Sequence, residues 1–170
     1  MNIFALHIQP NISAKYHCDK HVVKMIVESA QMISTVFDKY GQRKSWMYKS
    51  CFQHHPCTLW AGYGRRNLIW LIDLGYHLCL EYTKRYGKTH KCFGMYLLWK
   101  KLVLDLPIPD KKFTNFALAV LPELKEKIGD NYTLLESINC YREYYMIHKV
   151  EMKKWKNVEK PFWWIEKFKE

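Results

Sequence analysis

The chain lacks several features that mark whole classes of protein. No apolar run approaches the roughly 20 residues that a helix needs to cross a bilayer. The opening MNIFALHIQP has no basic region ahead of a long apolar stretch, so we expect no secretory leader. The 6 Cys include no CxxC pair, which favours reduced core thiols over disulfides or a standard zinc site. With only 7 Gly and 6 Pro, no linker or low-complexity tract divides the 170 residues.

Motifs of the large nucleotide-binding and hydrolase families are also missing. The only glycine cluster, GYGRRN, is too short for a P-loop or a dinucleotide-binding fingerprint. No Ser or Cys lies in a nucleophile-elbow context. We therefore do not expect a hydrolase that depends on any of these motifs.

Acidic residues are scarce. The chain has 16 Asp and Glu against 27 Lys and Arg, a formal net charge of +11. Such a field attracts polyanions, so DNA is the first partner to expect and an anionic membrane surface the weaker one. The stretches RRNLIW and YTKRYGKTHK interleave cations with aromatic rings, as a nucleic-acid-binding groove does.

What the sequence does contain is helical periodicity. It predicts a short extended segment at residues 3–8, stopped by Pro10, and then a long helix that ends near Gly41. Further helices are predicted from Pro56, over 65–87, over 92–104, from Thr114 and over 122–129, with a last long one over 130–156 ahead of an aromatic tail. The expected fold is mainly α, a single compact helical domain over 1–170 with a short extended N-terminal segment.

One polar line runs along the first predicted long helix. Between residues 15 and 40 the helical spacing aligns His17, His21, Lys24, Glu28, Gln31 and Thr35, and almost every other position is apolar. Surface helices have the opposite balance, so this helix is predicted to be buried on most sides. An exposed ladder of ion pairs is the alternative, and we favour an acid–base or electrostatic site.

A second polar line is predicted within residues 65–87 and just beyond. Its members are Arg66, Trp70, Asp73, His77, Glu81, Lys84 and Lys88. If the two helices pack together, the lines converge near His77 and Glu81. The loop CFQHHPC places Cys51, His54, His55 and Cys57 close together, and with His17 and His21 they form the less favoured alternative, a zinc site.

Asp19, His21 and Glu28 form D-x-H-x6-E near the amino terminus. This motif resembles D-Q-H-x6-E in the small all-helical pyrimidine-dimer DNA glycosylases of phage type, and the likeness continues loosely through HHPCTLW to KTHK. The motifs YHCDKHVVKM, HPC-x-W and YREYY also resemble a family of uncharacterised proteins of large DNA phages and giant viruses. That second likeness carries no activity but implies a viral, DNA-associated setting.

The glycosylase resemblance implies a mechanism and a set of site residues. In that family the chain's terminal amine attacks C1′ of the damaged nucleotide and the helix glutamate assists. Carried over, Glu28 is the catalytic carboxylate, His21 contacts substrate, and the amine is that of Met1. Asn2 is a large second residue, so we expect Met1 to be retained, whereas the glycosylases expose a processed residue. The predicted nucleic-acid contacts are His17, Lys20, Lys24, Arg65, Arg66, His77, Lys84, Arg85 and Lys88.

The leading hypothesis is a viral DNA N-glycosylase/AP lyase that acts on a damaged or modified base. It is expected to work without a cofactor or a metal, as a monomer, on DNA and not on a membrane, in the cytoplasm of the host cell. Two alternatives stay open at this point. One is a non-catalytic basic protein that binds nucleic acid, and the other is a metal-dependent enzyme that modifies nucleotides.

Overall fold

The computed structural model describes residues 1–169, and within that range the regular structure is entirely helical. This confirms the predicted mainly α fold; the assignment of residues 1–170 to one domain stays a prediction. The helices are α1 (Pro10–Tyr16), α2 (Asp19–Lys39), α3 (Pro56–Ala61), α4 (Arg65–Tyr86), α5 (Phe93–Leu102), α6 (Pro122–Ile128), α7 (Leu134–His148), the 3-10 turn η1 (Val150–Met152) and α8 (Phe162–Phe168).

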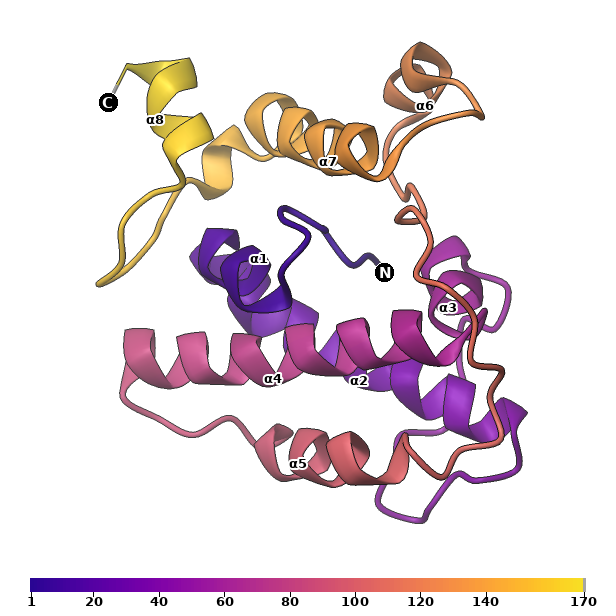
Figure 1. Ribbon diagram of the computed structural model, residues 1–170. Coiled ribbons are helices and arrows are strands. Elements are labelled where there is room, and N and C mark those ends of the chain that lie inside the picture. Colours follow the sequence, from indigo (N-terminus) through magenta and orange to yellow (C-terminus); the bar gives the residue numbers. More distant parts are fainter. Residues whose placement is uncertain (170) are drawn as a thin grey trace.

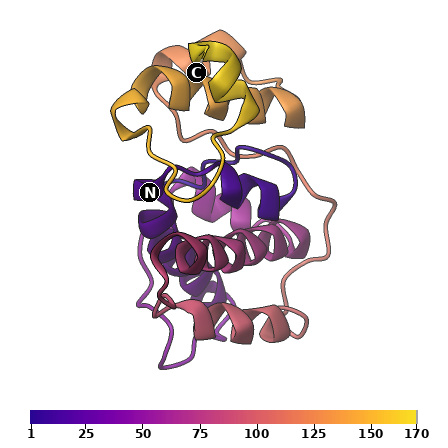
Figure 2. The same cartoon turned by 90° about the vertical axis from the view of Figure 1, so that its left-hand side faces the viewer.

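The amino terminus runs through the middle of the molecule. In Figures 1 and 2, α6, α7 and α8 lie on one side and α2, α4 and α5 on the other, with residues 1–9 threaded between them. Ile3, Ala5 and Leu6 in this segment are fully buried. Burial of an irregular segment requires partners for its backbone groups, and that requirement fixes where the first residue of the chain lies. No helix within residues 1–169 is both long and apolar enough to cross a membrane.

Helix α5 packs closely on α4 at a glycine. Gly75 of α4 faces Tyr96 of α5, and a Cβ at position 75 would lie 2.0 Å from the Tyr96 ring. The Tyr96 hydroxyl passes beyond it and donates to the carbonyl of Ile26 on α2, at 2.6 Å. One buried tyrosine therefore joins α2, α4 and α5, and this fixes the helix that carries Glu28.

Several predicted boundaries are correct for local reasons. Pro56 and Pro122 start α3 and α6, where a missing N–H costs nothing. Gly87 ends α4 with φ of 67°, in the left-handed region that glycine enters without strain. The start of α7 was not predicted: Thr133 and Glu136 form a capping box there, four residues after the expected start.

Other predictions were wrong. The helix expected up to Gly41 is two helices, because His17 and Cys18 are extended and separate α1 from α2. Pro10 begins α1 instead of only ending the extended segment. No helix starts at Thr114, the last long helix covers only Leu134–His148, and the aromatic tail contains α8. In each case the outcome depends on tertiary contacts that periodicity does not report.

Candidate active site

The terminal amine lies beside Glu28. Oε2 of Glu28 is 3.8 Å from the Met1 nitrogen and accepts a hydrogen bond from the Asn2 backbone N–H at 2.9 Å. Oε1 of the same carboxylate is 3.5 Å from Nζ of Lys24, one turn earlier on α2. One carboxylate therefore sits between two cationic amines. The side chain of Glu28 is 13% exposed, so it is shielded yet reachable from solvent.

These groups line one open cavity of about 310 Å³. Three lysines and the terminal amine surround it against a single carboxylate, so the cavity favours an anionic ligand. Segments distant in sequence meet there: the N-terminal segment, the first half of α2, the stretch before α6, and the end of α7 with η1. The lining residues are Met1, Asn2, Phe4, Lys20, His21, Lys24, Met25, Glu28, Ala119, Tyr144, Lys149 and Met152.

His21 forms part of the floor of this cavity. Its ring stacks on Phe4, with centroids 4.3 Å apart, and its Nδ1 shares a hydrogen bond with the Tyr145 hydroxyl. Burial first, and then the charges of His17, Lys149 and Lys24, lower the pKa of His21 to about 3. His21 is therefore a neutral imidazole at physiological pH.

Two residues at the start of α3, His55 and Thr58, lie close to Met1, the first residue of the chain. The Met1 side chain is 1% exposed, and the Thr58 hydroxyl lies 3.9 Å from its sulfur. The pKa of His55 is lowered first by burial and then by the charge of the terminal ammonium, so this ring lies near the chain terminus. The same side chain caps the N-terminus of α3 by accepting from the Cys57 backbone N–H.

A terminal amine paired with a glutamate of D-x-H-x6-E is the arrangement that the glycosylase resemblance implies. The family model for pyrimidine dimer DNA glycosylase matches residues 1–94 of the 170. The chain belongs to the pyrimidine dimer DNA glycosylase family. No curated protein and no solved structure gives a match. The resemblance seen in the motifs is thereby confirmed, and the protein is a DNA-binding enzyme of the glycosylase/AP lyase type.

The glycosylase match ends before several residues that complete the cavity. Tyr144, Lys149 and Met152 come from α7, its C-terminal end and η1, and Ala119 from the stretch before α6. Lys149 Nζ lies 5.0 Å from the centre of the Tyr144 ring, which in turn stacks on Phe4 at 5.9 Å. Sequence reasoning missed all four. The only signal was YREYY, whose tyrosines lie on two sides of one helix turn.

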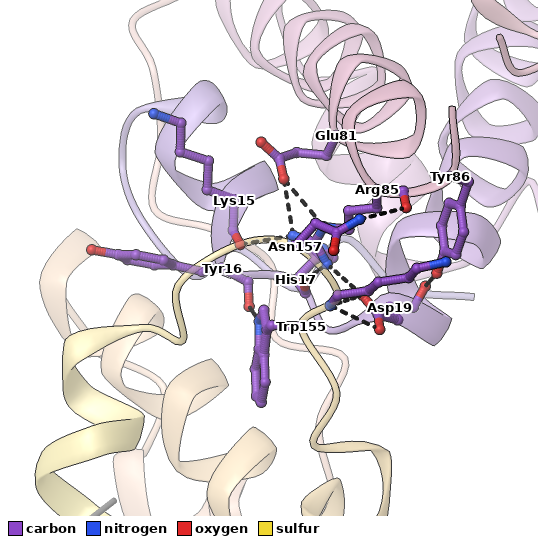
Figure 3. Close-up of polar contacts among 10 residues, drawn as sticks. Lys15, Tyr16, His17, Asp19, Glu81, Arg85, Tyr86, Trp155 and Asn157 are labelled. Carbon is purple, nitrogen blue, oxygen red and sulfur yellow. Dashed lines mark hydrogen bonds and ion pairs between the residues drawn. The ribbon is translucent and has the colours of Figure 1, made fainter. Parts of the chain in front are cut away.

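Arg85, which the sequence predicts as a nucleic-acid contact, is buried and engaged within the protein. It is 1% exposed, and its guanidinium donates to Glu81 at 3.0 Å, to Asp19 at 3.1 Å and to the carbonyls of Lys15 and His17. Figure 3 shows this cluster closing over the α1–α2 junction. Arg85 and Asp19 belong to neither polar line, and their ion pair joins α4 to the start of α2. Of the two lines, only Glu81 takes part in this cluster through its side chain, as the partner of Arg85.

Arg65 is also structural. Its guanidinium donates to the carbonyls of Val103, Leu104, Leu106 and Ile108, so it clamps the chain after α5 onto the start of α4. A guanidinium with four carbonyl partners is engaged within the protein. These bonds give Arg65 a structural role, and its phosphate contact stays a prediction.

The other predicted contacts divide between cavity, interior and open surface. Lys20 and Lys24 line the cavity with Met1, His21 and Glu28, whereas His17 is fully buried beneath it with Nδ1–H donating to the Ser13 carbonyl. The surface residues Arg66, Lys84 and Lys88 are exposed and line no part of it. His77 is half-buried on α4, where the charges that act on it are those of Asp73, Lys100, Glu81 and Lys15.

The residues of the zinc alternative do not gather. Within residues 1–169 no three His, Cys, Asp or Glu side chains are placed to hold a metal ion. Cys57 is buried against the Tyr141 hydroxyl, and His55 accepts a hydrogen bond from the Cys57 backbone. In the CFQHHPC loop, His55 thus serves as the cap of α3 and Cys57 as part of the core.

Proposed function

We propose that this enzyme removes a damaged pyrimidine from DNA and then cleaves the abasic site, using its terminal amine as nucleophile. The observation that carries the proposal is the 3.8 Å separation of the Met1 nitrogen from Glu28 Oε2 at the wall of an open cationic cavity. A nucleophilic amine needs a nearby group that accepts and returns protons, and a carboxylate at this distance serves that role.

The chemistry follows from these two groups. The lone pair of the amine forms a bond to C1′ as the bond from C1′ to the base breaks, and the base leaves with that electron pair and a proton from the nitrogen. The C1′–O4′ bond then opens to leave an iminium ion. Glu28, which has taken a proton from the terminal ammonium to free the lone pair of the amine, delivers that proton to O4′, and its restored negative charge stabilises the cation. On an abasic site the amine adds to the aldehyde, and loss of water gives the same iminium.

The cationic wall suits the DNA backbone. Lys20, Lys24 and Lys149 surround the amine, so phosphates on either side of an extruded nucleotide have partners. Extrusion costs a few kcal/mol, and the cost is smallest where a lesion has already weakened the stacking. The description of the matching family makes an ultraviolet-induced pyrimidine dimer the first substrate to test. The viral setting, the host-cell cytoplasm and the monomeric state stay predictions from the sequence.

Borohydride trapping tests the proposal. The full-length protein is incubated with duplexes that carry one abasic site, one pyrimidine dimer or no lesion, in the presence of sodium borohydride. Reduction of the iminium leaves a stable secondary amine that joins protein and DNA. We expect an adduct with the first two duplexes and none with the third. If DNA binds and neither lesion gives an adduct, the amine mechanism is wrong.

A further inference from the structure

The residue next to the amine is held more firmly than a chain terminus needs to be. Asn2 is 7% exposed, and its side chain makes three hydrogen bonds. Nδ2 donates to the carbonyl of Ala119 at 2.6 Å. Oδ1 accepts from the backbone N–H groups of Ile3 and Phe4, at 2.7 and 3.0 Å. With the backbone N–H on Glu28, every polar hydrogen-bonding group of Asn2 except its carbonyl has a partner in this set.

The turn that Asn2 closes is strained. Phe4 has φ of 39°, in the left-handed region that a residue with a bulky side chain rarely enters. Its ring is held between His21, at 4.3 Å, and Tyr144, at 5.9 Å. Strain of this kind persists only where surrounding contacts fix it, and such positions gather at functional sites. The strained turn follows Met1 and Asn2, whose backbone nitrogens both lie beside the Glu28 carboxylate.

We propose that Asn2 is a positioning residue that holds the amine of a retained Met1 in reach of C1′. This inference rests on the proposed function. Asn2 itself cannot supply the nucleophile while Met1 is attached, because its nitrogen is an amide whose hydrogen points to Glu28. Met1 has its own place in the fold, with its side chain 1% exposed beside Thr58. Retention of Met1 matches the large second residue, since methionine is removed mainly ahead of small ones.

The Ala119 carbonyl, which accepts the hydrogen bond from the Asn2 side chain, lies outside the part of the chain that matches the family. Ala119 belongs to the segment between α5 and α6, and the match ends at residue 94. The C-terminal half therefore contributes a fixed acceptor for Asn2 in addition to Tyr144 and Lys149. The partner of the Ala119 carbonyl is the Asn2 side chain. Loss of that side chain should leave Glu28 and the lysines in place and free only the Met1 amine.

Two substitutions separate positioning from folding. Asn2→Asp keeps the acceptor for Ile3 and Phe4 but loses the donor to Ala119, and Asn2→Leu loses all three side-chain bonds. Both residues are large, so Met1 stays, and intact-mass measurement verifies this. Asn11→Leu, at an exposed asparagine of α1, is the matched control. Trapping rates on abasic-site DNA are measured at saturating DNA, with Kd and Tm measured alongside.

A misplaced nucleophile costs rate at saturation and leaves DNA affinity intact. We expect about a tenfold slower adduct formation for Asn2→Asp and about a hundredfold for Asn2→Leu, with Kd within about twofold of the native protein. Peptide mapping should place the adduct on Met1. If both variants trap at the native rate, or if the adduct maps to Asn2 of a processed chain, the inference is wrong. Absence of any adduct with the native protein would instead refute the proposed function.

Discussion

Tyr145 of α7 hydrogen-bonds to His21 of α2, and through this contact a helix beyond the family match fixes the floor of the active site. The bond spans 124 positions in sequence. Its neighbour Tyr144 packs on Phe4, so consecutive tyrosines hold the two sides of one aromatic stack. The C-terminal half is therefore part of the framework of this cavity, and the predictions below test both halves.

The first prediction concerns Glu28. Glu28→Gln keeps an acceptor for the Asn2 N–H but removes the charge and the proton carrier. We expect adduct formation on abasic-site DNA to slow by about 10² to 10³, the range typical of losing a general acid–base group. Fluorescence anisotropy should show unchanged or slightly tighter DNA binding. The matched control is Glu126→Gln on the exposed face of α6, and a native trapping rate in Glu28→Gln would contradict the assignment.

The second prediction concerns Lys149, at the end of α7. Because it lines the cavity, 5.0 Å from the centre of the Tyr144 ring, we expect it to contact a phosphate of the DNA. Lys149→Ala should weaken DNA binding and lower the slope of log K against log salt by about 0.9, the effect of one lost phosphate contact. Lys125→Ala, on the exposed surface of α6, should leave the slope unchanged. Equal slopes for the two variants would remove Lys149 from the DNA interface.

The third prediction concerns Arg85. Arg85→Met removes the ion-pair partner of Glu81, whose side chain is only 8% exposed. It also removes the donors to the carbonyls of Lys15 and His17. We expect a loss of about 3 to 5 kcal/mol in the free energy of unfolding, measured by urea denaturation. Lys84→Ala, at an exposed neighbouring position, should change it by less than about 0.5 kcal/mol. Weaker DNA binding at unchanged stability would reinstate Arg85 as a DNA contact.

The fourth prediction concerns pH. Burial lowers the pKa of His17 to about 4 and that of His21 to about 3, from an ordinary 6.5. Below pH 6.5 the unfolded chain therefore binds protons that the folded chain does not, and stability falls as the pH falls. Between pH 7 and 5 we expect each histidine to cost on the order of 1 to 2 kcal/mol.

The slope of stability against pH isolates this effect from the cost of the substitution itself. His21→Gln, which can still bond to the Tyr145 hydroxyl, should flatten the decrease between pH 7 and 5 by about 1 to 2 kcal/mol. His54→Gln alters an exposed loop side chain and should leave the slope as it is. A steep native slope that survives in His21→Gln would mean that other groups titrate in this range.

The alignment of His21, Lys24 and Glu28 could be read from sequence because those residues belong to one regular helix. Helical spacing is a local property, and it places three side chains on one face whatever surrounds them. Extending the same line to His17 failed, since Arg85 and the backbone N–H of Lys156 hold Asp19 at the start of a new helix. His17 then lies in the interior.

The basic residues show the same division. Charge alone indicated a polyanion partner, because the net charge is a sum over the sequence and needs no fold. The net charge does not tell which of the Lys and Arg side chains face the partner. Lys20 and Lys24 line the cavity. Arg65 and Arg85 instead donate hydrogen bonds within the protein, to backbone carbonyls and, for Arg85, to carboxylates.

The sequence by itself determined the helical class, the basic field and the motif that pairs His21 with Glu28. Each depends on composition or on residues within two turns of one helix. Only the tertiary structure decided that the amine of Met1 meets Glu28, that Asn2 is anchored at Ala119, and that Tyr144 and Lys149 close the cavity. Those contacts join segments up to about 150 residues apart, and their pairing is set by packing of the whole core, which no local pattern contains.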